Sequence, residues 1–223
     1  MNINGQSVQV DMRMMKRKSM RLALTDEGVV DLRVPMGCSQ LEVARFLDKH
    51  ESWLVQRLTQ LQENKLSRLN EFQHLGRYLP LVRLSGLKAV EVAEDLVRIP
   101  DDWNDEQILA ALENWRRRFA QEEFGRQIDE WWPLFSRFAR SRPVLRVKKM
   151  RTRWGSLSTR GYINLNLALT QMPPELIELV VVHELCHLKH MDHGKGFQAL
   201  MTQALPDWRI REQQLKALAK NMV

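Results

Sequence analysis

His183 and His187 stand four positions apart in residues 183–187 (His-Glu-Leu-Cys-His), with Glu184 next to the first of them. The preceding stretch, 176–182, is almost entirely apolar, so a helix here would be buried. Burying two imidazoles and a carboxylate without partners costs several kcal/mol. Histidines at i and i+4 of one helix face can, however, chelate a Zn²⁺ ion, with the glutamate beside the zinc-bound water. The segment therefore predicts a zinc hydrolase of peptide bonds, in which Glu184 takes a proton from that water and passes it to the leaving group.

A catalytic zinc site needs a third protein ligand, and both His190 and His193 follow closely. In a continuous helix, at about 1.5 Å per residue, His183 and His190 would lie about 10.5 Å apart along the axis. Three imidazoles in such a line suit tetrahedral coordination poorly. His193 is favoured, because the glycines at 194 and 196 allow the helix to end near Met191 and the chain to turn His193 back toward the ion.

Other third ligands stay open from the residues alone. A carboxylate farther along the chain, Asp207 or Glu212, is the alternative. The histidine spacing matches the metzincin pattern, but His190 stands where that pattern has glycine, so membership of that group is not indicated. We expect His190 itself to be solvated or to support a ligand.

Further segments extend the match beyond the five-residue motif. They are Thr152-Arg153-Trp154-Gly155-Ser156, Ile163-Asn164-Leu165-Asn166, Pro173-Pro174, the stretch from Val181 to Leu188, and His193 with Phe197. With these segments nearly the whole chain resembles the YgjP-like metallopeptidases, small zincins related to the SprT-like and WLM groups.

The resemblance implies an α+β fold with His183, His187 and His193 as zinc ligands and Glu184 as the catalytic base. Where that family usually has a cysteine, this sequence has Leu157. We expect this position to pack or to shape a hairpin and not to bind the metal.

Positive charge is concentrated just before the expected metal site. The chain has 34 Lys and Arg against 27 Asp and Glu, a formal charge of +7. No acidic residue occurs from Trp131 to Pro174, and nine Lys and Arg lie between 137 and 160. This surplus favours an anionic partner. Nucleic acid bound through residues 137–160, with Trp154 and Tyr162 stacking on bases, is one interpretation, and a solvated basic face is the other.

Residues 1–100 are expected to form a β-rich region with one long helix. Apolar and polar residues alternate at 8–12, 20–24 and 30–34, which predicts three half-buried strands. A turn at 25–28 should join the last two, with Gly28 free to take a positive φ. Ser39 and Glu42 have the capping-box spacing and predict a helix from about 40 to 64. Short strands are expected at 78–84 and 90–99.

Residues 101–223 are expected to form a zincin-like core. Asn104 and Gln107 predict a second capped helix, which should run to about Glu130 and break at Trp-Trp-Pro, residues 131–133. From 144 to 169 the pattern is extended, with the small and polar residues 154–161 as a connection, and a hairpin should lead into the metal helix that starts at 173–175. The strand at 162–169 is expected to have one wet face.

As in zincins generally, this hairpin should hold the substrate backbone by strand addition. The side chains expected near the cleft are Arg153, Trp154, Asn164 and Asn166. Ordinary sheet packing for the tryptophan and solvation for the polar residues are the alternatives.

The composition favours a cytoplasmic protein without a membrane partner. The first thirty residues have no apolar signal-peptide core, and no apolar run reaches the roughly eighteen residues that span a bilayer. Cys38 and Cys186 are too few for a disulfide framework, so we expect two reduced thiols.

Three functions compete. A zinc-dependent metallopeptidase acting on peptide or protein substrates is favoured. A nucleic-acid-associated zinc protein that acts on DNA-bound proteins would use the basic stretch. A non-catalytic, zinc-containing interaction module is the third, but a structural site has no need of a base such as Glu184 beside the ion.

Overall fold

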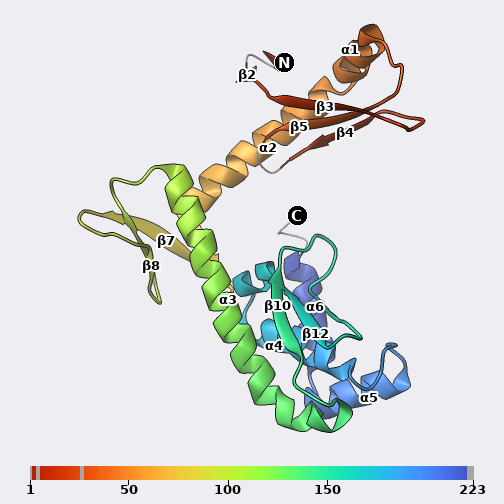
Figure 1. Ribbon diagram of the computed structural model, residues 1–223. Coiled ribbons are helices and arrows are strands. Elements are labelled where there is room, and N and C mark those ends of the chain that lie inside the picture. The colour runs from red at the N-terminus through yellow and green to blue at the C-terminus, as the bar shows by residue number, and fades with distance from the viewer. Residues whose placement is uncertain (1, 4–5, 26–27, 220–223) are drawn as a thin grey trace. The chain divides into compact units, whose positions relative to one another are not determined.

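The computed structural model describes residues 2–3, 6–25 and 28–219, with the backbone alone at 2, 3, 6 and 64–69 (Figure 1). The chain contains helices together with sheets that are either antiparallel or mixed, which is the expected α+β class. Contacts divide the chain into two compact units, one ending at Asn70 and the other beginning at Glu71. This division falls earlier than the border expected after residue 100. None of the helices in the described ranges is long and apolar enough to cross a membrane.

The first unit contains a mixed sheet in the order β3-β5-β4. β3 (Val10–Met15) runs parallel to β5 (Val30–Pro35), and β4 (Arg21–Leu24) pairs antiparallel with β5. A short ladder joins β1 (Asn2–Ile3) to β2 (Gln6–Ser7). Val30, Leu32 and Val34 of β5 are fully buried, which confirms the alternating pattern. Gly28 has φ +81°, as the predicted turn requires, whereas residues 26–27 of that turn lie outside the described ranges.

The helix predicted from 40 to 64 is in fact two, α1 (Gln40–Lys49) and α2 (Glu51–Asn70). The capping box is confirmed: the Ser39 hydroxyl accepts from the Glu42 N–H at 3.3 Å, and the Glu42 carboxylate accepts from the Ser39 N–H at 2.8 Å. The interruption comes at His50, whose ring Nδ1 lies 2.7 Å from the Phe46 carbonyl. In a continuous helix that carbonyl would accept the His50 N–H, so the imidazole competes with the helix at this point.

The second unit starts with a sheet in the order β6-β7-β9-β8. Its strands are β6 (Glu71–His74), β7 (Arg77–Leu84), β8 (Glu91–Val92) and β9 (Val97–Pro100). The turn between β6 and β7 anchors this sheet to a later segment, because Leu75 and Gly76 donate N–H bonds to the Thr170 and Gln171 carbonyls, each at 2.9 Å. These bonds explain why residues 71–100 group with the core that follows them.

α3 (Asp105–Phe135) is the longest helix of the described chain. Its capping box is confirmed by reciprocal bonds between Asn104 and Gln107 at 3.0 and 2.9 Å. The break expected at residues 131–133 is wrong, since the helix passes through Pro133 and ends at Phe135. Pro133 has no N–H to donate to the carbonyl of Asp129, four residues earlier, so the helix lacks one backbone hydrogen bond near its end.

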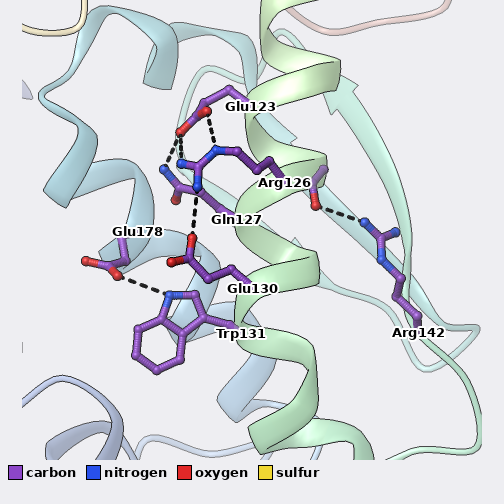
Figure 2. Close-up of polar contacts among 8 residues, drawn as sticks. Glu123, Arg126, Gln127, Glu130, Trp131, Arg142 and Glu178 are labelled. Carbon is purple, nitrogen blue, oxygen red and sulfur yellow. Dashed lines mark hydrogen bonds and ion pairs between the residues drawn. The ribbon is translucent and has the colours of Figure 1, made fainter.

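Side-chain contacts fasten the last turns of α3 to neighbouring elements (Figure 2). The Trp131 indole N–H donates to a Glu178 carboxylate oxygen of α4 at 3.1 Å, and Arg211 of α6 contacts the other oxygen at 2.5 Å. Arg142, in the segment after the helix, pairs with Asp129. Glu178 therefore connects three helices, which compensates for the bond lost at the proline.

A small mixed sheet precedes α4 (Pro174–Cys186). Its order is β10-β12-β11, from β10 (Val144–Lys148), β11 (Gly155–Leu157) and β12 (Tyr162–Asn166), with η1 (Ser136–Phe138) before it and η2 (Leu167–Gln171) after it. β11 and β12 form the predicted hairpin, while β10 pairs parallel with β12. The strand predicted to continue to Leu169 ends at Asn166, and its expected wet face is wrong because Asn164 and Asn166 are both buried.

Three helices complete the second unit: α4 (Pro174–Cys186), α5 (Lys195–Ala204) and α6 (Trp208–Ala219). They pack with α3 and the small sheet around one core that includes Phe124, Phe135 and Phe197. Both cysteines are free thiols, Cys38 half-buried and Cys186 buried. Burial raises the pKa of the Cys186 thiol to about 12, so it behaves as an inert small hydrophobe.

Candidate metal centre

α4 is a short, apolar helix at the centre of the second unit. Pro174 stands in its first turn and Glu175 places negative charge there, as a helix start favours. Nine of its residues are buried: Leu176, Ile177, Leu179, Val180, Val181, Val182, Glu184, Leu185 and Cys186. Its surroundings therefore fix the positions of the polar side chains near its end.

The structure brings His183, His187 and His193 together. One ring nitrogen from each lies within 4.8 Å of the others, and the Nε2 atoms of His183 and His193 are 3.1 Å apart. The helix expected to reach Met191 ends earlier, with His187 as the C-cap residue. The chain then turns through residues 188–194 before α5, and this turn returns His193 from outside the helix. Sequence reasoning anticipated this return.

His190 supports the cluster through its backbone. Its carbonyl lies 2.9 Å from Nδ1 of His187, so that nitrogen carries the proton and Nε2 keeps its lone pair for a metal. The His190 ring packs on Gly196, where an added Cβ would come within 2.6 Å of Cε1. His190 thus contacts a candidate ligand. Support of a ligand was one of the two roles expected for this residue.

The two carboxylates considered as alternative ligands lie elsewhere. Asp207 pairs with Arg211 at 2.8 Å and Glu212 pairs with Lys216 at 3.0 Å. In the described ranges, neither joins the group of side chains that the three histidines form.

Phe197 forms the apolar support of the cluster. It is 1% exposed, and its ring centroid lies 4.9, 5.0 and 4.8 Å from those of His183, His187 and His193. The three imidazoles therefore share one rigid contact surface. Burial, together with the proximity of His187 and His193, lowers the pKa of His183 to about 4. This ring is neutral at physiological pH, and the neutral ring is the form that binds a metal.

Glu184 lies beside the histidines and is 4% exposed. Its carboxylate fits against Gly155 of β11, where an added Cβ would come within 2.5 Å of Oε1. Burial raises the pKa of Glu184 to about 7, although a hydrogen bond from the Leu157 backbone and the positive charge of Arg153 act in the opposite direction. The other carboxylate oxygen, Oε2, is buried without a hydrogen-bond partner among the described residues.

Sequence reasoning missed the role of Gly155. It read this residue as part of a connection, whereas Gly155 begins a strand and allows the sheet to approach the carboxylate. Glycine within a strand pattern is a known sign of close backbone approach and could have indicated this role. Leu157 packs against the core, as predicted, and its backbone contacts Glu184.

The four side chains expected near a cleft have different roles. Asn166 donates to the Met150 and Arg153 carbonyls at 2.8 and 3.0 Å, so it shapes the loop before β11. Asn164 donates to Ser156 across the hairpin, and Trp154 is half-buried against the core. Arg153 alone among the four is exposed.

A glutamate between two histidines on a buried helix, with a third histidine returning beside them, is the arrangement found in metallopeptidases. The metallopeptidase-domain model of the YgjP-like family matches residues 18–218, and the chain belongs to that family.

Other comparisons give weaker likenesses. None of the curated proteins matches the chain. Among solved structures, the metallopeptidase zymogen abylysin of Pyrococcus abyssi is 19% identical, with a TM-score of 0.39 over 44% of this chain and 95% of that one. The zymogen jannalysin of Methanocaldococcus jannaschii is 20% identical, with a TM-score of 0.38 over 44% of this chain and 89% of that one.

Proposed function

We propose that this protein is a zinc-dependent metallopeptidase in which His183, His187 and His193 hold one Zn²⁺ and Glu184 is the general base. One observation carries the proposal. Three imidazole nitrogens gather within 4.8 Å of one another, beside a buried carboxylate that has one oxygen without a partner among the described residues.

The residues present fit a catalytic zinc site. Such sites use three protein ligands and leave a further position for water or substrate, whereas structural sites are closed by four. The candidate group consists of these three histidines in the described ranges. When bound, zinc would supply Lewis acidity, which lowers the pKa of water and polarises a carbonyl group.

Glu184 is suited to moving a proton at neutral pH. A general base works best when its pKa lies near the working pH, and burial brings the pKa of Glu184 to about 7. The Leu157 backbone and Gly155 hold its carboxylate in one place. In the proposed reaction, Glu184 accepts a proton from the attacking water and delivers it to the amine that leaves when the peptide bond breaks.

The β11 edge offers a place for an extended peptide. The Trp154 carbonyl and the Ser158 N–H bond to Asn166 and Tyr162 of β12, each at 2.8 Å. Ser156 pairs with Asn164 in the same register, so Gly155 and Leu157 direct their backbone groups to the other side, where the Leu157 N–H already bonds to Glu184. Within the described sheet no strand covers that side. A substrate strand that adds there would place its backbone beside Glu184.

The proposal is tested by a search for new N-termini in a proteome treated with the zinc-loaded protein or with its Glu184→Gln form. Cleavage products are expected with the first and not with the second. Both forms should hold one zinc per chain, because Glu184 is not among the three nitrogen donors. Equal sets of products from both forms would remove Glu184 from the mechanism. Zinc in both forms, without products from either, would support a non-catalytic zinc module instead.

The nucleic-acid interpretation stays a prediction. Tyr162, proposed to stack on bases, is covered by the Arg146 guanidinium, 3.4 Å from its ring centroid. Trp154, the other proposed stacking residue, packs against the core. Neither contact favours a base-stacking surface.

A further inference from the structure

Several cations of the basic stretch are engaged within the fold. Arg142 pairs with Asp129, and the Lys149 ammonium lies 2.6 Å from a Glu113 carboxylate oxygen. Arg146 covers the Tyr162 ring. These three residues stabilise contacts with α3 and within the small sheet, so their charges are already partly matched.

Arg153 differs from these residues. Its side chain is exposed, and no Asp or Glu of the described chain lies within ion-pair distance of it. Its backbone is nevertheless fixed, because its carbonyl accepts from Asn166 at 3.0 Å and the following residue, Trp154, is packed against the core. The result is a guanidinium on a rigid backbone, two residues before the glycine that touches Glu184.

The position of Arg153 is close to the proposed reaction centre. Arg153 stands two residues before Gly155, and Gly155 lies against the Glu184 carboxylate. The positive charge of Arg153 also acts on Glu184, and no ion pair or hydrogen bond joins these two side chains among the described residues. A planar guanidinium binds carboxylates through two parallel hydrogen bonds, so an unmatched one beside an open strand edge can hold a carboxylate of an incoming peptide.

The sequence around Arg153 also favours the binding of a carboxylate. No acidic residue occurs from 131 to 174, and the one Asp in the turn that carries His193 is Asp192, whose carboxylate accepts from the Gly194 N–H at 3.3 Å. Few negative charges therefore compete for Arg153 or repel an acidic peptide there.

We propose that Arg153 recognises a carboxylate of the substrate near the scissile bond, so that this site, if it is the peptidase proposed above, prefers acidic peptides. The carboxylate comes either from an Asp or Glu side chain or from the free C-terminus of a short peptide. Both sources present the same chemistry to the guanidinium, and peptides can distinguish them.

The test measures binding as well as cleavage. Four fluorescent peptides share one sequence, with Glu or Gln near the middle and with a free or an amidated C-terminus. Their binding to the zinc-loaded Glu184→Gln full-length protein is followed by anisotropy. The peptides bearing the recognised carboxylate should bind about tenfold more tightly than the amidated Gln peptide, and the difference should shrink as salt screens the charges. Comparing the two single-carboxylate peptides identifies the source.

Arg153→Gln should abolish this difference, whereas Arg160→Gln, in the exposed turn between β11 and β12, should preserve it. Arg153→Lys should retain part of the affinity difference. Arg153→Glu should reverse the charge preference, so that a peptide with a central Lys binds more tightly than one with a central Glu. Zinc content and circular dichroism check that each variant is folded. Should one variant fail to fold, the others carry the same test.

Equal binding of all four peptides would overturn the inference. An equal loss of the affinity difference in the Arg153 and Arg160 variants would also overturn it, because it would indicate attraction by the overall positive charge of this surface. Cleavage of acidic and neutral peptides at equal rates by the wild-type protein would leave the proposed function standing and overturn the acidic preference. If Arg153→Gln slowed both by the same factor, Arg153 would act on the reaction itself and not on substrate choice. Selective binding without any cleavage would overturn the proposed function and preserve the inference.

Discussion

Gly155 lies against the side chain of Glu184, so closely that a Cβ on it would stand 2.5 Å from Oε1 and 2.8 Å from Cγ. Gly155 begins β11, and Glu184 is next to His183 on α4. The absence of a side chain at one residue therefore sets how near the small sheet comes to the proposed base. The same contact shields the carboxylate from water and contributes to its raised pKa.

Gly155→Ala should reduce peptidase activity by at least about tenfold, because a displacement of about 1 Å in a reacting group can cost more than that. The zinc content should not change, since the histidines are untouched. Gly125→Ala in α3 is the matched control. An added Cβ there meets nothing within 4 Å, so activity should stay and stability should rise by about 0.5–1 kcal/mol. Full activity in the Gly155 variant would contradict the positioning role.

His193→Ala and His190→Ala should differ sharply in zinc binding. His193 offers a ring nitrogen to the proposed site, whereas His190 contributes its backbone carbonyl, which alanine also has. Zinc titration with a competing chelator should show a large loss of affinity for the first variant and a change of about tenfold or less for the second. Comparable losses in both would assign His190 a direct role.

Glu178→Ala should destabilise the second unit by about 2 kcal/mol. The substitution leaves the Trp131 indole N–H without its acceptor, and Arg211, whose side chain is 18% exposed, keeps Asp207 as its one remaining carboxylate partner besides the Glu175 carbonyl. Urea unfolding of the zinc-free protein measures the loss. Glu212→Ala breaks an exposed pair with Lys216 and should change the free energy of unfolding by no more than about 0.5 kcal/mol.

His74 should make the protein less stable in mild acid. Burial, aided by the charge of Arg116, lowers its pKa from 6.5 to about 4. Between these values the unfolded chain binds a proton that the folded chain does not, so the His74 contribution is complete above pH 6.5 and is lost as the pH falls toward 4.

In the His74→Phe variant, an aromatic ring replaces the imidazole among Phe72, Trp115 and Phe119 without a titrating group. The drop in unfolding free energy from pH 7 to pH 5 should be about 1 kcal/mol smaller in this variant, with allowance for solvent around the half-buried ring. Identical pH dependence in the two proteins would show that His74 titrates normally.

Local patterns predicted much of this structure. Both capping boxes, at Ser39 and at Asn104, mark helix starts that the structure contains, because their bonds join residues three apart. The period-two alternation located β3, β4 and β5 for a similar reason. The gathering of His193 with the helix histidines followed from the reach of a turn rich in glycine.

Long-range contacts caused the differences. The helix through Pro133 is held by Glu178 and Arg142, which lie on other elements. Asn164 and Asn166 look like a wet face in a strand pattern, but they bond to the loop and hairpin that fold over them. Gly155 has the sequence context of a loop glycine, and its role depends on its contact with Glu184 of α4. Residue spacing along the chain does not encode these neighbours.

The turn at Leu75 and Gly76 has a practical consequence for dividing the protein. Leu75 and Gly76 each donate one N–H bond to η2, and Gly76 also fits against Pro173, where a Cβ would come within 2.8 Å of the proline ring. A fragment that starts at residue 101 would therefore lose the brace immediately before α4, and two carbonyls would lose their donors. Starting at Glu71 instead keeps that brace, so this is where a minimal fragment that contains the candidate site should begin.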